Sequence, residues 1–322
     1  MAANSNFIDV SNITYCGKEA QEIFAKDVYA LDLRGYGITL MDNVKGKTKL
    51  YSGELGSVWQ EYTCPFSPDG EVVLSEDYIE PVAIKVNLEN CYDTFWNTYL
   101  VEQTSITLNG GVPATFGEWF FERLRVEMAK EYQEIFFKGD TDYDGATKTY
   151  LALTDGVQKI LETALDDTAN LIEGSDFTVN NIIAQVEAAV MAGLASAATA
   201  EVSTDNYKIL LNKDDVRLLM IALGKDCSCN LTNSEFKNYA VENGRIYVMG
   251  FEVVPTEQNR STVIFGPAKN LVLGFDTLDS HVEYKFIDMR ETTGDNMFRI
   301  IAISNIAVGV IYPALFTLSK PR

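Results

Sequence analysis

The chain has 322 residues, of which 47% are hydrophobic and 22% charged, so it has enough apolar side chains for a sizeable folded core. Aspartate and glutamate number 46 against 26 lysines and arginines, and the formal net charge is −20. That balance excludes a protein that grips nucleic acid through clustered basic residues, because phosphate contacts supply most non-specific affinity for DNA.

Cysteine usage and the first residues indicate a soluble protein made in a reducing compartment. The five cysteines are scattered, and Cys227 and Cys229 have no second pair nearby, so neither a disulfide framework nor a zinc site is expected. The first nine residues lack the basic and apolar regions of a secretory signal. The richest apolar stretch, residues 188–200, is too short for a membrane span, and we expect no membrane association.

Residues 1–34 are predicted to form an arm that packs on something outside its own subunit. They hold too many apolar side chains for a disordered tail, yet the spacing of these side chains is irregular. Phe7, Ile8 and Phe24 are the candidate anchors for this packing. A short helix is expected over residues 19–30.

Residues 35–89 are predicted to form an extended β-hairpin. Glycines and prolines punctuate the segment, residues 78–88 end in an alternation of apolar and polar side chains, and residues 64–70 supply the turn. A two-stranded hairpin alone is marginal in water. We therefore expect it to lie on a neighbouring copy, with Trp59 and Phe66 as anchors.

The clearest predicted element is a helix over residues 113–138. Apolar side chains recur every four residues from Phe116 to Phe136, Pro113 suits the first turn, and Gly139 suits the position after the last turn. At 1.5 Å per residue, such a helix is about 39 Å long. The pattern predicts a long amphipathic rod with one side in the core.

Beyond residue 150 the pattern becomes mixed α/β. Residues 179–194 predict an amphipathic helix, residues 207–211 predict a short strand, and Asn212 predicts the N-cap of a helix that ends at Gly224. The dipeptide 243–244, Asn-Gly, is typical of a tight hairpin turn. Further strands are predicted at residues 251–254, 263–265, 282–287, 298–303 and 307–318.

Few residues point to catalysis or to a bound metal. His281 is the single histidine, and neither a Gly-x-Ser-x-Gly motif nor a P-loop accompanies it. The acidic turn with Asp140, Asp142 and Asp144 is similar to the first half of a calcium loop, but Leu151 stands where such a loop has glutamate. We expect an acidic turn there in preference to a metal site, with no catalytic residues and no cofactor.

The order of these elements resembles the Hong Kong 97-like fold of the major capsid proteins of tailed bacteriophages. Seven segments between residues 35 and 318 are similar to that family in pattern and in order, and no single one is a specific motif. These segments are residues 57–61 with 78–88 and 91–95, residues 116–139, residues 155–160, residues 208–215, residues 247–255, residues 263–267 with 271–274, and residues 308–316.

The resemblance implies an α+β capsid fold in five parts. These parts are an N-terminal arm (1–34), an extended loop (35–89), a peripheral domain (90–150) with a spine helix (113–138), an axial domain (151–255), and late strands that return to the peripheral domain (256–322). The resemblance further implies a structural protein, not an enzyme, that self-assembles into pentamers and hexamers of an icosahedral head.

The partners and location are also implied by the resemblance. A separate scaffolding protein, a portal and a decoration protein would join the shell, which is assembled in the host bacterial cytoplasm, becomes part of the virion and encloses double-stranded DNA without sequence-specific contacts. Some members crosslink a loop lysine to a neighbour. Lys45, Lys47 and Lys49 are expected in a mobile loop of this region, but nothing marks a reacting pair.

Two alternatives stay open from the sequence. The first is the shell protein of an encapsulin-type bacterial nanocompartment, which has the same fold but encloses a cargo enzyme. The second belongs to another class: a soluble α/β enzyme or calcium-binding protein that uses the acidic turn at Asp140–Asp144.

Overall fold

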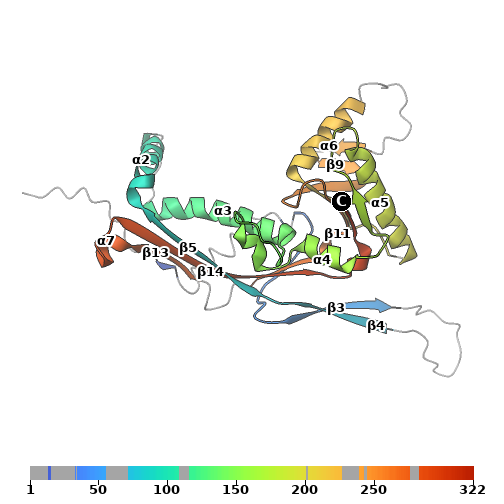
Figure 1. Cartoon of the computed structure of the whole chain (residues 1–322), viewed down its shortest axis with the longest axis horizontal. Helices are drawn as coiled ribbons and strands as arrows, with labels where there is room; N and C mark the ends of the chain where they lie inside the picture. Colours follow the sequence, from blue (N-terminus) through green and yellow to red (C-terminus); the bar gives the residue numbers. More distant parts are fainter. Residues whose placement is uncertain are drawn as a thin grey trace, which may run out of the picture. The chain divides into compact units, whose positions relative to one another are not determined.

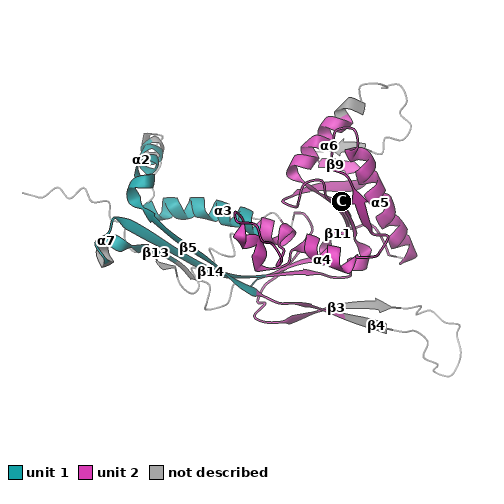
Figure 2. Cartoon of the chain, viewed as in Figure 1, with its two compact units in different colours: residues 1–32, 82–132, 275–306 teal, residues 33–81, 133–274, 307–322 magenta. Residues whose placement is uncertain are grey.

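The computed structural model describes residues 14–15, 33, 35–55, 72–108, 116–200, 202–226, 239–242, 245–275 and 283–322. The chain forms two compact units, coloured separately in Figure 2, and passes between them several times. Unit 1 comprises Met1–Asp32, Val82–Tyr132 and Phe275–Ile306, and unit 2 comprises Leu33–Pro81, Gln133–Gly274 and Ala307–Arg322.

Unit 1 is built on an antiparallel sheet whose central strand is β14 (Met297–Val310). β14 pairs with β13 (Glu283–Asp288) along one edge and with β5 (Val82–Cys91) along the other, and β13 also pairs with the short β1 (Thr14–Tyr15). Alternate β14 residues such as Phe298, Ile300 and Ala302 are buried, as expected for a sheet with one covered face.

Helices α2 (Tyr92–Leu108) and the first part of α3 (Phe116–Lys138) supply many aromatic side chains of the unit 1 core, and β13 and β14 add Phe286 and Phe298. The short α7 (Met289–Thr292) follows β13. Phe116 is fully buried at the start of α3, where its ring meets those of Tyr92 and Phe298 at centroid distances of 5.0 and 5.4 Å. The prediction of a long helix ending at residue 138 is confirmed.

Unit 2 is built on a seven-stranded mixed sheet (Figure 1). In spatial order its strands are β6 (Leu171–Gly174), β15 (Thr317–Pro321), β11 (Val263–Pro267), β7 (Tyr207–Asn212), β10 (Phe251–Thr256), β9 (Arg245–Val248) and β8 (Tyr239–Glu242). The predicted hairpin around residues 243–244 is confirmed, because β8 and β9 pair antiparallel and Glu242 lies opposite Arg245.

Two helices pack on this sheet beside one another. α5 (Ile182–Thr199) contacts β11 and β15, α6 (Lys213–Asp226) contacts β7 and β10, and the two helices contact each other. Their inward residues share one apolar core with the sheet, and α4 (Val157–Ala164) contacts β15. The predicted N-cap of α6 is confirmed, because Asn212 Oδ1 accepts a hydrogen bond from the Asp214 N–H at 2.9 Å.

Unit 2 also holds the β-hairpin and a small parallel pair. β3 (Thr48–Leu55) and β4 (Val72–Ile79) pair antiparallel from Thr48–Ile79 to Leu55–Val72. β2 (Thr39–Met41) pairs parallel with β12 (Leu271–Gly274), which in turn pairs with the last residues of β14. The described part of the unit also contains three short 3₁₀ segments: η1 (Thr149–Leu153), η2 (Ala268–Asn270) and η3 (Pro313–Leu315).

Two strand predictions are corrected by the structure. The segment 78–88 is not one strand of the hairpin: β4 ends at Ile79, and after Glu80 and Pro81 the chain joins β14 as β5. Proline has no N–H for a strand ladder, which explains a break at this point. Residues 298–303, 307–310 and 317–318 are strand as predicted, but the break expected between 303 and 307 is wrong, because β14 runs unbroken to Val310 and the break lies around η3.

One helix of the described residues, α5, is long and apolar enough by length and composition to cross a membrane. The sequence analysis placed the richest apolar stretch at residues 188–200, which is shorter. In the structure α5 contributes Val186, Val190 and Ala197 to the core of unit 2, as the packed helix of a folded domain does.

Candidate functional site

The hairpin base is the first surface feature that bears on function. Leu50 and Ile79 are buried against Val44, Val272 and Ala307, so the hairpin is rooted in unit 2. β3 and β4 pair only with each other among the described strands. A two-stranded ribbon of eight residues a side needs support beyond its own pairing.

Charged and aromatic side chains decorate this hairpin. Lys49 donates to Glu76 across the strands at 2.6 Å, and the ammonium of Lys47 lies 4.6 Å from the ring centre of Tyr78, which is exposed. The expectation that Lys49 lies in a mobile loop is corrected, because it belongs to β3 and pairs with Tyr78. The sequence around Gly46 is typical of a loop, but Lys47 and Lys49 have their partners on β4, about 30 residues later in the chain.

A buried carboxylate ties the end of α3 to the loop that follows it. Glu134 is only 4% exposed and accepts hydrogen bonds from Lys148 at 2.7 Å, from Lys138 at 3.4 Å and from the Tyr150 hydroxyl. Burial alone would raise the pKa of Glu134, but these hydrogen bonds and the two lysine charges outweigh burial and lower the pKa to about 2. The carboxylate is therefore ionised at neutral pH.

Replacing Glu134 by glutamine is expected to lower the free energy of unfolding by about 2 kcal/mol at neutral pH, since hydrogen bonds to charged groups contribute about that much. The pKa of Glu134 is lower in the folded chain than in the unfolded chain. Its ionic contribution is therefore complete above the ordinary glutamate pKa and is lost as the pH falls toward about 2. Urea unfolding of both proteins at about pH 7 and about pH 3 should show the difference shrinking in acid.

Glu127 provides the matched control on the same helix. It is exposed and pairs with Lys130 at 3.2 Å, so Glu127→Gln should change the free energy of unfolding by less than about 0.5 kcal/mol. Equal effects of the two substitutions, or a Glu134→Gln effect that does not change with pH, would contradict the anchoring role of Glu134.

The acidic turn after α3 is closed by a lysine. Lys159 Nζ lies 2.9 Å from Asp140 Oδ1 and 3.0 Å from Asp142 Oδ2, and Asp155 accepts hydrogen bonds from Thr141. Within the described ranges, no three histidine, cysteine, aspartate or glutamate side chains are grouped so as to hold a metal ion. The structure therefore gives no support to a metal site at Asp140, Asp142 and Asp144.

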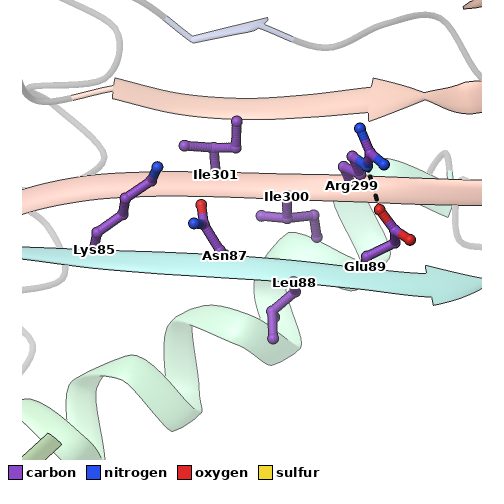
Figure 3. A pocket seen from close by; sticks show the side chains of 7 residues that line it. All are labelled: Lys85, Asn87, Leu88, Glu89, Arg299, Ile300 and Ile301. Carbon is purple, nitrogen blue, oxygen red and sulfur yellow. Dashed lines mark hydrogen bonds and ion pairs between the residues drawn. The ribbon is translucent and has the colours of Figure 1, made fainter.

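A shallow hollow lies on the sheet of unit 1, across β5 and β14 (Figure 3). It measures about 320 Å³ and is lined by charged, amide and aliphatic side chains: Lys85, Asn87, Leu88, Glu89, Arg299, Ile300 and Ile301. Its two charged groups nearest each other, Arg299 and Glu89, are paired with one another between the two strands.

The predicted anchors cannot be placed from the structure. Phe7, Ile8, Phe24, Trp59 and Phe66 lie outside the described residues and stay predictions. His281 and the cysteines at positions 227 and 229 also lie outside them. The sequence analysis missed the Glu134 cluster, because Glu134 reads as an ordinary polar residue of α3 and its partners follow only after the turn.

Comparison with known proteins gives a likeness in structure alone. No family model matches the chain, and no curated protein matches it in sequence. Three solved structures are similar along almost the whole chain. The first is a chain of the satellite phage P4 procapsid that includes the size determination (Sid) protein, with a TM-score of 0.60, 12% sequence identity, and coverage of 97% of this chain and 93% of that chain. The second is the capsid of an empty GTA particle, with a TM-score of 0.51, 14% identity, and coverage of 90% and 89%. The third is the capsid of Myoviridae phage XM1, with a TM-score of 0.51, 11% identity, and coverage of 91% and 92%.

These likenesses define the class of fold. All three span about nine-tenths or more of both chains, so the whole arrangement of helices and strands is shared and not one common motif. The chain has the mixed helix-and-sheet fold of phage capsid proteins. The expected α+β fold of phage capsid proteins is thereby confirmed, and its division into five parts stays a prediction.

Proposed function

We propose that the chain is the major capsid subunit of a tailed bacteriophage and assembles with copies of itself into the pentamers and hexamers of an icosahedral head. The observation that carries the proposal is the likeness to capsid chains over nearly the full length of both partners. The rooted but otherwise unsupported β3–β4 hairpin agrees with it, because such a ribbon needs a neighbour to lie on.

We assign the parts of the subunit in line with this role. Residues 1–34 serve as the arm, 35–89 as the extended loop, 90–150 with 256–322 as the peripheral domain, and 151–255 as the axial domain. α3 serves as the spine helix. The seven-stranded sheet, with α5 and α6 on it, supports the axial assignment because five of its strands begin between residues 151 and 255, while β11 and β15 join it from the late segment.

The negative charge of the chain agrees with a shell that encloses DNA without binding it tightly. With a net charge of −20, the shell interior repels the packaged double-stranded DNA, and no sequence-specific contact is needed. The subunit acts as a structural protein of the virion with no catalytic role. Assembly takes place in the host cytoplasm and involves a separate scaffolding protein, a portal and a decoration protein.

Two other functions were left open by the sequence. An encapsulin-type nanocompartment has the same kind of shell, and cargo protein in place of DNA inside purified particles would favour it. A soluble calcium-binding protein or enzyme at the acidic turn is not favoured, because the Lys159 ammonium already pairs with both Asp140 and Asp142.

Removing residues 1–12 is expected to leave folded subunits that form no closed particles. The truncation deletes Phe7 and Ile8, each of which contributes about 1.5–3 kcal/mol when buried against a neighbour. It keeps β1, whose Thr14 and Tyr15 pair with β13. Negative-stain microscopy should show shells for the full chain co-expressed with its scaffolding partner and none for the truncated chain, while circular dichroism stays unchanged.

A second variant separates the loss of the anchors from the loss of length. Full-length chain with Phe7→Ser and Ile8→Ser should fail in the same way. Normal shells from both variants would contradict the role of the arm in assembly. A full chain that stays a stable monomer under every condition tested would contradict the proposed function itself.

A further inference from the structure

The outward side of α5 carries an uncharged row of small and apolar side chains. Exposed residues follow one another at steps of four and three positions, which places them on one line along the helix: Ala184, Ala188, Met191, Ala195 and Ala198. Met191 is 56% exposed although it is a large apolar side chain. Only about a third of the helix is buried within the subunit.

The row ends at a concave surface. A hollow of about 540 Å³ lies beside the C-terminal half of α5 and the turn η3, and Ala195 belongs both to the row and to the lining of the hollow. Tyr312 and Leu315 line it together with several alanines, and Thr168, Asn170, Ser196 and Thr199 add polar groups. Small side chains beside a hollow leave room for protruding side chains of another helix.

α6 presents the complementary shape on the same unit. Met220 and Ile221 are 50% and 54% exposed, so two large apolar side chains stand out from this helix. The nearby Arg217 and Asp214 pair with each other at 3.0 Å and cancel in charge. These two neighbouring apolar side chains are therefore available to pack against another surface.

We propose that the α5 row of one copy is covered by α6 of a second copy of this chain. This inference rests on the proposed function and names one contact within it. Size complementarity matches the large Met220 and Ile221 to the small row and its hollow. Charge points to the same occupant: copies with a net charge of −20 repel one another, and they approach most readily through surfaces without net charge.

The contact joins two different surfaces, so it is heterologous. Each copy offers one α5 row and one α6 pair, and a repeated contact of this kind closes into a ring when its rotation returns to the start. A membrane is a poor occupant, because the other side of α5 is fixed in the core of unit 2 through Val186 and Val190. The second copy is therefore the partner that the surface fits.

Charge-reversal rescue tests the contact and identifies the occupant. Ala188→Glu alone and Ile221→Lys alone each place an unpaired charge in the contact, and each should lower the yield of shells at least about tenfold. The double variant pairs the two charges across the contact and should recover most of the yield. Because both positions are exposed, the subunits should stay folded by circular dichroism.

Thr163→Glu on α4 is the matched control, since it adds the same charge at an exposed helical position of the same unit. It should leave the shell yield unchanged. If both single variants assemble as well as wild type, or if the double variant assembles no better than either one, the α5–α6 contact is overturned while the proposed function stands. If wild-type subunits form no shells, the proposed function fails instead.

A photo-crosslinking residue at position 188 gives a second measurement inside assembled shells. A covalent dimer whose linked peptide comes from residues 213–226 supports the contact. A dimer linked to any other segment, or a link to a different protein, overturns it.

Discussion

Replacing Phe116 by alanine should lower the free energy of unfolding by about 3–5 kcal/mol, the largest effect expected from any single substitution considered for this chain. Phe116 is fully buried where α2, α3, β13 and β14 meet. Besides Tyr92 and Phe298, its ring lies 5.4 Å from that of Tyr99 and 5.6 Å from that of Trp119. Alanine would leave a cavity that these rings, each held by its own strand or helix, cannot fill.

Urea unfolding followed by tryptophan fluorescence measures this loss, because Trp119 and Trp96 both lie in the same ring cluster. Val126→Ala on the same helix is the control, since Val126 is 71% exposed and its removal should cost less than about 0.5 kcal/mol. A loss below about 1 kcal/mol for Phe116→Ala would mean that the cluster does not hold unit 1 together.

Replacing Gly156 by alanine is expected to destabilise unit 2 by about 3 kcal/mol through overpacking against backbone. Gly156 donates its N–H to the Gly139 carbonyl at 2.8 Å, which brings the two chain segments together at the end of α3. A Cβ atom on Gly156 would lie 2.6 Å from Gly139 N and 2.8 Å from the Ile135 carbonyl oxygen. Neither is the end of a flexible side chain, so one segment must move.

Gly46→Ala is the matched control, because a Cβ there meets no atom within 4 Å. This substitution should be neutral or slightly stabilising, by up to about 1 kcal/mol, since alanine restricts the unfolded chain. Thermal unfolding of both variants measures the contrast. Similar melting temperatures for the two variants would show that the close approach of Gly139 and Gly156 is dispensable.

Elements with strong local signals could be predicted from the sequence. α3 carries an apolar repeat of four residues and ends before Gly139, and α6 begins directly after the N-cap Asn212. The dipeptide 243–244 correctly joins β8 to β9. In each case the information lies within a few neighbouring residues.

Other elements depend on partners that are distant in the sequence. α2 was missed, because its β-branched and aromatic residues, such as Thr94, Trp96 and Val101, favour strands in isolation. It is helical where its aromatic side chains pack on α3 and β14. β14 was expected to break near Ser304 and Asn305, but the Tyr132 hydroxyl of α3 donates to the Asn305 carbonyl at 2.9 Å, and the strand continues.

The sequence predicted that apolar surfaces serve assembly, but it did not predict the α5 and α6 surfaces proposed here. The sequence indicated that apolar residues of the first hundred positions serve neighbouring copies, and those anchors lie outside the described residues. The sequence predicted an amphipathic helix over residues 179–194, but it did not show which of its alanines face outward, because alanine is common both in cores and on helix surfaces. Exposure is a property of the folded unit, and only the structure supplies it.

The position of β15 sets an order on biosynthesis. β15 lies between β6 and β11 in the seven-stranded sheet, although β6 begins at residue 171 and β15 at residue 317. The sheet of unit 2 therefore stays divided until residues 317–321 have been translated, and pairings between such distant segments form slowly. A nascent chain that has not yet supplied β15 lacks a completed unit 2, so we expect subunits to associate only after β15 has been synthesised.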